Sequence, residues 1–431
     1  MQDYRRSDGM DFISTRGLAP NVNASEAILK GLADDGGLYV PSQFPYIDFK
    51  SLRGATSYPE VAFEVLAPFF VNDELQNDLA EICYEAFNFA LPLHPLSEKE
   101  LVMELFWGPT AAFKDFGARF LAIAMEKLMA KRNRPLTILV ATSGDTGGAV
   151  AAAFHKRENI NVKVLFPKGR VSARQEKQLT CWGDNVETYA VEGSFDDCQR
   201  MVKEAFGDSK LVEQYGLSSA NSINLGRLLP QMVYPFYASL EIAERFNQES
   251  TMIIPSGNIG NSCGTYWAKV VGAPIKNVIL ALNANKTVVD YLESGVYEKR
   301  SSIATLANAM DVGDPSNIER LNHLFGDFET FKKEVSAYSV SDEEIKQTIE
   351  RVWNEYNYPI CPHTATGEFV RNKLKLTDPT VVYATAHPAK FDTIVEPIIN
   401  KEIPIPDQLA VLLEKESSYN EIEADYHHLF E

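Results

Sequence analysis

The sequence predicts an α/β protein built on parallel β-sheet, and two observations predict this class. Short runs rich in Val, Ile and Leu end at Gly-rich turns and give way to Ala-rich helical patterns, the alternation typical of βα units. This plan is clearest in LTILVATSGDTGGAVAAAF (136–154), and TMIIPSGNIGNSCGTYWAKVVG (251–272) repeats it. Further runs of similar composition predict strands at 161–166, 186–191, 277–283 and 380–386.

A helix is predicted directly after Lys114. Apolar residues follow at helical spacing and form one face, made of Phe116, Phe120, Leu121, Ala124, Met125 and Leu128. Lys114 should then lie at or just before the helix N-terminus. Residues 1–95 are predicted to form a separate, largely helical lead-in region, in which DDGGLYVPSQFP (34–45) marks turns.

Composition and charge indicate which kind of molecule the protein binds. The 431 residues suffice for two or three domains, and 41 Lys and Arg against 59 Asp and Glu leave a net charge of −18. An acidic surplus repels nucleic acid phosphates and anionic membrane surfaces, so we expect a small-molecule partner, with no nucleic acid and no membrane. There is no signal-peptide core and no run approaches the about 18 apolar residues of a membrane helix, which predicts a cytoplasmic protein.

The cysteines and histidines predict neither a disulfide framework nor a metal site. The five cysteines are odd in number, lie far apart and form no CxxC pair, so reduced thiols are expected. The histidines form no HExxH pair or other metal-ligand spacing.

Two glycine-rich turns are each suited to an anion. PSGNIGN (255–261) follows a predicted strand and opens a helix, so its backbone N–H groups and the positive helix end converge on one spot. ATSGDTGG (141–148) repeats this arrangement and adds the polar groups of Ser143, Asp145 and Thr146. The alternative is a plain turn in the first case and helix capping in the second. Two such turns together indicate a ligand with two acidic ends.

Lys114 lies between Phe113 and Phe116 in AAFKDFGARF (111–120). If the aromatic rings strip its water away, the pKa of the amine falls and more of it is neutral and nucleophilic. The alternative is that the methylenes pack on the rings while the charge reaches solvent. A nucleophilic amine together with a nest for a small phosphate is the minimum set of groups that pyridoxal phosphate requires.

Motifs along nearly the whole chain resemble those of the threonine synthase family, pyridoxal-phosphate enzymes with the fold of the tryptophan synthase β-subunit. The motifs are ISTRG (13–17), GLADDGGLYVP (31–41), GPTAAFKDFGARF (108–120), ATSGDTGGA (141–149), FPKGRVSARQEKQ (166–178), NSINLGRLLPQ (221–231), PSGNIGN (255–261), AMDVGDPSNIER (309–320), PHTATG (362–367) and ATAHPAKF (384–391). The resemblance implies fold type II of these enzymes, with two open, mostly parallel twisted sheets flanked by helices. It also implies three domains: an N-terminal domain at 1–95, a domain with the cofactor-bonding lysine at 96–250 and a large domain at 251–431.

The resemblance implies a role for several residues. Lys114 corresponds to the lysine that bonds to the cofactor and moves protons during turnover. The cofactor phosphate would be held by Gly257, Asn258, Ile259, Gly260 and Asn261, and the pyridine nitrogen would face Thr385. The amino-acid end of the substrate would be held by Thr142, Ser143, Gly144, Asp145 and Thr146. Asn221 and Arg227 are candidates for the substrate phosphate, since an Arg fork suits phosphate oxygens; the alternative for Arg227 is an ordinary helix-surface charge.

The implied activity is that of a lyase in threonine biosynthesis, which converts O-phospho-L-homoserine and water to L-threonine and phosphate by γ-elimination and β-addition. Three alternatives stay open: a serine or threonine dehydratase or β-replacement enzyme with the same cofactor, a non-catalytic binding relative, and a dinucleotide-dependent oxidoreductase. The absence of GxGxxG after any predicted strand argues against the last. The sequence leaves the oligomeric state open, and a monomer is favoured.

Overall fold

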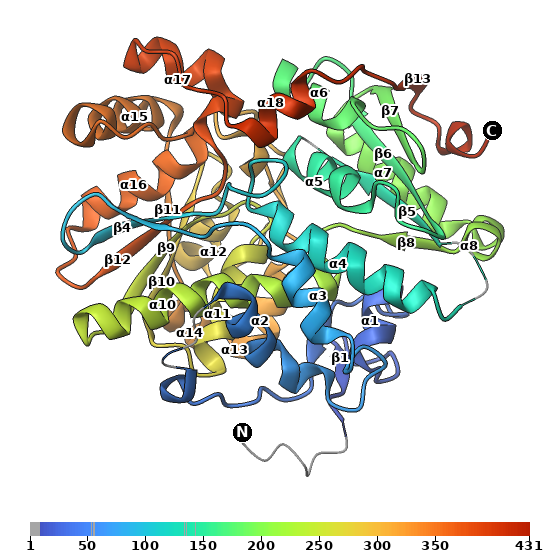
Figure 1. The fold of residues 1–431 in the computed structure, drawn as a ribbon, viewed down its shortest axis with the longest axis horizontal. Helices are drawn as coiled ribbons and strands as arrows, with labels where there is room; N and C mark the ends of the chain where they lie inside the picture. Colours follow the sequence, from blue (N-terminus) through green and yellow to red (C-terminus); the bar gives the residue numbers. More distant parts are fainter. Residues whose placement is uncertain (1–8, 53, 55–56, 133, 135, 143) are drawn as a thin grey trace.

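The computed structural model describes residues 9–431 except 53, 55–56, 133, 135 and 143. The described chain contains two parallel-rich sheets flanked by helices, with the N-terminal segment packed beneath them in the view of Figure 1. This architecture confirms the predicted fold class.

The larger sheet has six strands in the order β11-β10-β9-β12-β4-β3. Neighbouring strands are parallel except for β3 and β4, which are antiparallel. The strands are β3 (Leu93–Pro95), β4 (Glu100–Glu104), β9 (Ser250–Pro255), β10 (Ile275–Leu282), β11 (Ser336–Ser339) and β12 (Thr380–Ala384).

The smaller sheet has five strands in the order β13-β7-β6-β5-β8, and all its pairs are parallel. The strands are β5 (Leu136–Ala141), β6 (Ile160–Pro167), β7 (Val186–Glu192), β8 (Leu217–Ser219) and β13 (Asn420–Glu423). The strands predicted at 161–166 and 186–191 here, and at 277–283 and 380–386 in the larger sheet, are confirmed to within two residues at their ends. The units predicted at 136–154 and 251–272 each begin with a strand, β5 and β9, and continue into a helix, α5 (Asp145–Phe154) and α11 (Gly260–Val270).

Helices cover both faces of each sheet. The α-helices are α1 (Ala24–Lys30), α2 (Tyr58–Leu66), α3 (Leu79–Ala86), α4 (Lys114–Met129), α5 (Asp145–Phe154), α6 (Ala173–Thr180), α7 (Phe195–Gly207), α8 (Ser209–Tyr215), α9 (Leu225–Leu228), α10 (Val233–Phe246), α11 (Gly260–Val270), α12 (Thr287–Ser294), α13 (Ile318–Phe325), α14 (Phe328–Glu334), α15 (Asp342–Tyr356), α16 (Pro362–Leu374), α17 (Asp392–Ile399) and α18 (Asp407–Leu413). In β5, Ile138 and Val140 share a core with α5, whereas Leu139 packs with α7, because successive side chains of a strand point to opposite faces.

Helix α4 joins the parts of the molecule. It packs against α3 of the lead-in region, against α5 beside the smaller sheet and against α9. The same continuous core contains Phe12 from β1 (Phe12–Ser14), Ile138 from β5 and Ile254 from β9. The helix whose first residue is Lys114 is thus fixed between both sheets and the N-terminal segment.

The lead-in region contains α1, α2 and α3 together with the antiparallel pair β1 and β2 (Tyr39–Pro41), which agrees with a largely helical segment. Strand pairing crosses the expected domain limits twice. Strands β3 and β4 belong to the larger sheet formed mainly after residue 250, and β13 returns from the C-terminus to pair with β7. The three-domain division stays a prediction.

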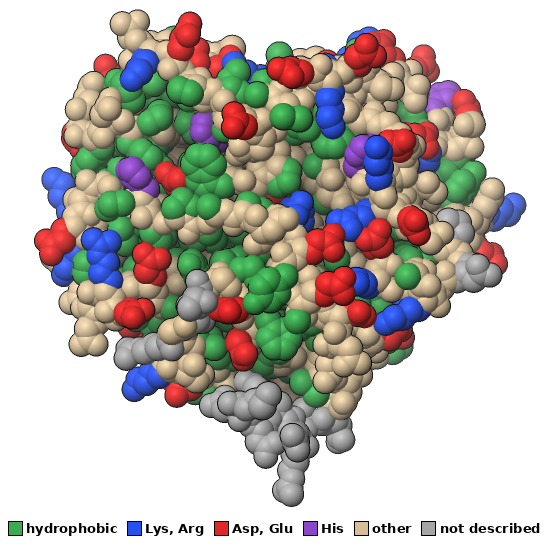
Figure 2. Space-filling model, in the orientation of Figure 1, with side chains coloured by type: hydrophobic (Ala, Val, Ile, Leu, Met, Phe, Trp, Pro, Cys, Tyr) green, Lys and Arg blue, Asp and Glu red, His purple; other side chains and the backbone are tan. Residues whose placement is uncertain are grey.

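The surface carries charge of both signs. Figure 2 shows acidic and basic side chains interspersed over the face it presents, with no extended basic patch. None of the helices in the described residues is long and apolar enough to cross a membrane. All five cysteines are buried free thiols.

Candidate active site

A cavity of about 1160 Å³ contains nearly all of the predicted site residues. Its walls come from the loops that follow β5, β9 and β12, as expected for parallel sheets, whose ligands bind beyond the carboxyl ends of the strands. The predicted residues that line it are Lys114, Thr142, Asp145, Thr146, Asn221, Arg227, Gly257, Asn258, Ile259, Gly260, Asn261 and Thr385. Gly144 is not among the lining residues, and Ser143 lies outside the described residues.

Lys114 is held at the cavity by its backbone. It is the first residue of α4, and the N–H of the preceding Phe113 donates to the carbonyl of Thr385 over 2.8 Å. Its ammonium nitrogen lies 5.8 Å from the centre of the Phe113 ring. Burial lowers the pKa of Lys114 to about 8, against an opposing contribution from the Asp145 carboxylate. About a tenth of the amine is therefore neutral at pH 7, far more than for an ordinary lysine, and the neutral form is the one that attacks carbonyls.

The loop before Lys114 is held by hydrogen bonds to Asp115, the residue that follows Lys114. The backbone N–H and the hydroxyl of Thr110 donate to the two carboxylate oxygens of Asp115, over 2.9 and 2.7 Å. Ala112 and Ala386 form an isolated antiparallel bridge. These contacts fix Lys114 relative to Thr385, which is buried and lines the same cavity.

The turn after β9 is built by its own side chains. The Asn261 side chain donates to the carbonyl of Pro255 over 2.9 Å and accepts from the Ser256 hydroxyl over 2.7 Å. Ile259 has φ of 64°, a left-handed conformation that aims the following amides along the start of α11. An added Cβ at Gly257 would meet the Cα of Met310 at 2.8 Å, so only glycine fits. The N-terminus of α11 thus opens into the cavity with its amides available to an anion.

The same turn is tied to two other cavity segments. The Asn258 amide donates to the hydroxyl of Ser222 over 2.5 Å and accepts from the N–H of Ser316 over 2.6 Å. Asn317 donates to the carbonyl of Asn258 over 3.1 Å. The segments around 222 and 316 therefore support the turn.

The turn after β5 is organised around one hydroxyl. The Thr142 oxygen accepts from the N–H groups of Gly144 and Gly147, over 3.0 and 2.9 Å. Gly144 has φ of 148°, and an added Cβ there would meet the Gln175 amide nitrogen at 2.6 Å. Thr146 is half-buried and faces the cavity.

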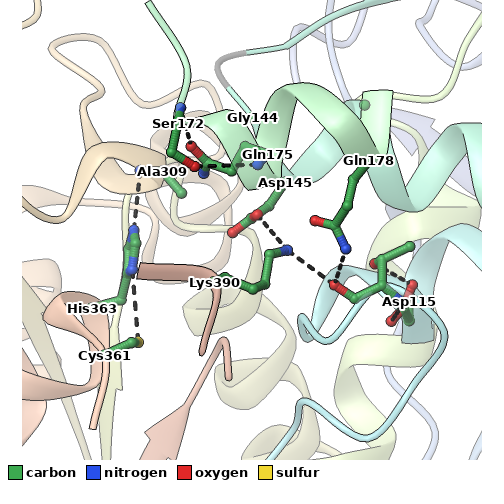
Figure 3. A network of polar contacts seen from close by, with 12 residues as sticks. Asp115, Gly144, Asp145, Ser172, Gln175, Gln178, Ala309, Cys361, His363 and Lys390 are labelled. Atoms are coloured by element: carbon green, nitrogen blue, oxygen red, sulfur yellow. Dashed lines mark hydrogen bonds and ion pairs between the residues drawn. The ribbon is translucent and has the colours of Figure 1, made fainter. Parts of the chain in front are cut away.

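Asp145 forms a buried ion pair that the sequence did not reveal. Its Oδ1 lies 2.6 Å from Nζ of Lys390, and both side chains are nearly inaccessible to solvent (Figure 3). Burial alone would raise the pKa of Asp145, but the charges of Lys390 and Lys114 lower it to about 2. The carboxylate is therefore ionised and already compensated.

His363 lies on the side of the Asp145–Lys390 pair opposite to Asp115 (Figure 3). Its Nε2 accepts from the N–H of Ala309 over 3.1 Å, and Nδ1 is 3.8 Å from Sγ of Cys361 (Figure 3). Burial lowers the pKa of His363 to about 4, so the ring is neutral at physiological pH. It orients the segment after 307 and adds no charge to the cavity.

Arg227 is buried in the wall and not on a helix surface. Its Nη1 donates to the carbonyl of Ala220 over 2.6 Å, whereas its Nε has no hydrogen-bond partner among the described residues. Burial lowers the pKa of Arg227 to about 10, so it remains a cation. Asn221 is half-buried nearby, and its backbone N–H donates to the Ser219 hydroxyl.

Sequence reasoning missed several residues of the site, among them Ser222 and Lys390. Both lie in motifs that were recognised, NSINLGRLLPQ and ATAHPAKF. The signal for Lys390 was the same as for Lys114, a single lysine beside apolar residues. The signal for Ser222 was only its position next to Asn221.

Three family models match the chain. The model for pyridoxal-phosphate dependent enzymes matches residues 91–383, and the models for the threonine synthase N terminus and C-terminal region match residues 11–87 and 364–430. A threonine synthase of Buchnera aphidicola (subspecies Acyrthosiphon pisum) is 40% identical over 90% of this chain and 91% of its own length. The threonine synthase of Escherichia coli K12 is 38% identical over 90% of this chain and 91% of its own length.

Solved structures agree with these matches. The structure of pyridoxal-phosphate-bound threonine synthase from Brucella melitensis superposes with a TM-score of 0.91 at 38% identity, covering 98% of each chain. Escherichia coli threonine synthase superposes with a TM-score of 0.90 at 35% identity, covering 97% of this chain and 98% of its own.

The fold and the cavity thus define a pyridoxal-phosphate-dependent enzyme of fold type II. Within that class, the chain belongs to the threonine synthase family.

Proposed function

We propose that this cavity binds pyridoxal phosphate through Lys114 and the 257–261 turn, and that the chain there converts O-phospho-L-homoserine and water to L-threonine and phosphate. One observation carries the proposal. A lysine whose pKa is lowered to about 8 faces the same cavity as a glycine-containing helix N-terminus. An amine for an aldehyde and an amide nest for a phosphate are the two attachments that this cofactor needs.

The residues fit the cofactor in further ways. At Gly257 the backbone of Met310 leaves no room for a side chain, so the turn is packed closely against another segment that lines the cavity. Thr385 would face the pyridine nitrogen, and a hydroxyl there leaves that nitrogen largely unprotonated. Arg227 contributes a buried donor, Nε, that lacks a partner among the described residues and can be satisfied by an anion.

Different residues of the chain would then move protons and bind the substrate. When bound, the cofactor supplies an electron sink for carbanion chemistry on the substrate. Lys114 would remove the proton from Cα and then a proton from Cβ as phosphate departs from Cγ. A proton would next be delivered to Cγ, which becomes the methyl group of the product, and Lys114 would return a proton to Cα after water has added at Cβ. The 142–146 turn holds the amino-acid end, and Asn221 and Arg227 hold the substrate phosphate. Holding the reacting bonds in line with the Lys114 amine supplies much of the rate enhancement.

The location and assembly state are part of the same proposal. The five cysteines are free thiols, as is usual for proteins in a reducing compartment. This supports a location in the cytoplasm. We favour a monomer. Light scattering of the purified protein tests the assembly state.

The test is a visible spectrum before and after borohydride, followed by peptide mass mapping and an assay of phosphate release from O-phospho-L-homoserine. We expect a cofactor-sized mass fixed on Lys114 and stoichiometric threonine and phosphate. Oxoacid and ammonia formed from L-serine or L-threonine, without phosphate release, would instead indicate a dehydratase. A protein that cannot be reconstituted with pyridoxal phosphate would indicate a binding relative.

A further inference from the structure

Lys390 is a completely buried cation that does not line the cavity. It lies in the short 3₁₀ helix η5 (Pro388–Phe391), just beyond Thr385, and its side chain has no solvent exposure. Asp145 and Lys114 do line the cavity. Lys390 therefore lies behind Asp145 in the wall, where it cannot touch a substrate.

The ammonium of Lys390 makes two contacts that lead toward Lys114. One is the ion pair with Asp145 at the start of α5, and the other is a 3.0 Å hydrogen bond to the carbonyl of Thr110 (Figure 3). The same carbonyl accepts from the Gln178 amide over 2.9 Å. Because the N–H and hydroxyl of Thr110 hold Asp115, the chain of contacts ends at the residue after Lys114.

A buried ion pair adds little net stability, because taking two charges out of water costs about as much as their attraction returns. This pair is distinguished by the position of its carboxylate, which interacts electrostatically with Lys114. Asp145 attracts the protonated form of Lys114, whereas Lys390 and Arg227 oppose it.

The other titratable groups near the pair carry little net charge. Burial lowers the pKa of His363 and of His387 to about 4, so both rings are neutral, and burial raises the pKa of the Cys361 thiol. The Asp115 carboxyl accepts both hydrogen bonds from Thr110, and Arg174, beside the same 3₁₀ helix, pairs with Asp392.

We propose that Lys390 is a positioning residue that neutralises Asp145, so that this carboxylate can shape the substrate turn without holding Lys114 in its protonated, unreactive form. The proposal rests on the function proposed above, and extends it from the residues that line the cavity to one behind them. Lys390 and Asp145 should consequently act on Lys114 in opposite directions.

The experiment measures protonation of Lys114 directly. The cofactor-free full-length chain is labelled with trace acetic anhydride between pH 6 and 10, and labelling of Lys114 is quantified by peptide mass mapping. Lys346, exposed on α15, is the internal reference. Only the neutral amine reacts, so the pH profile reports protonation without requiring turnover. If the parent protein released no phosphate from O-phospho-L-homoserine, the proposed function would be wrong. The labelling profile of Lys114 would still test the role of Lys390.

Three variants separate an electrostatic from a structural role. In Lys390→Met the uncompensated carboxylate holds the proton on Lys114, so labelling at pH 7 should fall about tenfold and its profile should move to higher pH. In Asp145→Asn the remaining cations favour the neutral amine, so labelling should rise and the profile should move to lower pH. The double variant should return to within about threefold of the parent, because both opposing charges are gone.

Shifts of both single variants in the same direction, or a double variant further from the parent than either, would overturn the proposal in favour of a purely structural pair. If Lys390→Met does not fold by circular dichroism, the nearly isosteric Asp145→Asn decides alone. Unchanged or slower labelling in that variant contradicts the proposal. In the loaded enzyme, the acid limb of the kcat/KM profile should move with the labelling profiles.

Discussion

The two glycine-rich turns of this chain follow the same sequence plan but are built differently. The turn after β9 is fastened by neutral hydrogen bonds, with the Asn261 side chain bridging the carbonyl of Pro255 and the hydroxyl of Ser256. The turn after β5 relies on the Thr142 hydroxyl and carries a buried carboxylate compensated by Lys390. One turn leaves the positive end of its helix open, whereas the other begins its helix with a negative charge.

That difference bears on what each turn can hold. A helix N-terminus free of fixed anions suits a permanently bound phosphate. In the turn after β5, the Asp145 carboxylate lies at the positive end of its helix and is paired with Lys390, so this helix end is less open to a second anion than that of α11. Similar strand-turn-helix sequences therefore do not imply similar ligands, because the charge within the turn decides.

The largest effect is expected from Lys114, which lines the same cavity as both turns. Lys114→Ala should lower phosphate release by at least about 10³-fold, because it removes both the attachment of the cofactor and the base. Lys127→Ala on the same helix is the control, since Lys127 pairs with Glu81 away from the cavity and should leave the rate nearly unchanged. Normal turnover by the Lys114 variant would show that the two turns serve some other group.

The turn after β9 is tested next, at Gly257. A methyl group added there meets the backbone of Met310, which cannot rotate away, so Gly257→Ala should displace the turn and weaken pyridoxal phosphate binding about 100-fold. Spectrophotometric titration of the cofactor-free protein measures this affinity. Gly183→Ala is the matched control, because an added Cβ there meets nothing within 4 Å. Equal affinities in the two variants would remove the turn from the cofactor site.

Arg227 lines the same cavity, and its variants test whether it binds the substrate phosphate or the cofactor phosphate. Arg227→Met should raise the KM for O-phospho-L-homoserine about 10-fold to 100-fold, as expected for loss of a charge-assisted phosphate contact, with a smaller effect on kcat. Arg227→Lys keeps the charge but not the planar fork and should fall between. A loss of cofactor affinity with an unchanged KM would instead assign Arg227 to the cofactor phosphate.

The sequence predicted features that depend on neighbouring residues better than features that depend on contacts between distant segments. Long periodic segments such as α4 and β5 were predicted because the pattern lies within the element. The return of β13 to the smaller sheet was not, because its short run NEIE carries little hydrophobic signal and pairs with a strand far away in the chain. Lys114 could be singled out through its neighbours in sequence, whereas Lys390 gains its meaning only from Asp145, which folding brings to it.

The smallest effects should separate the two turns most cleanly. Thr142→Val keeps the shape of the side chain but leaves the N–H groups of Gly144 and Gly147 without their acceptor. It should raise the substrate KM about 5-fold to 10-fold and leave cofactor affinity alone, since a lost buried hydrogen bond costs about 1 kcal/mol. Ser256→Ala removes a donor to Asn261 and the acceptor of the Ser262 hydroxyl, whereas the Asn261 Oδ1 still accepts from the N–H of Ser262. Cofactor affinity should therefore fall only about threefold, and KM should not change. Each variant is the control for the other. If both changed the same constant, the turns would share one ligand, and the contrast in their charge would have no functional meaning.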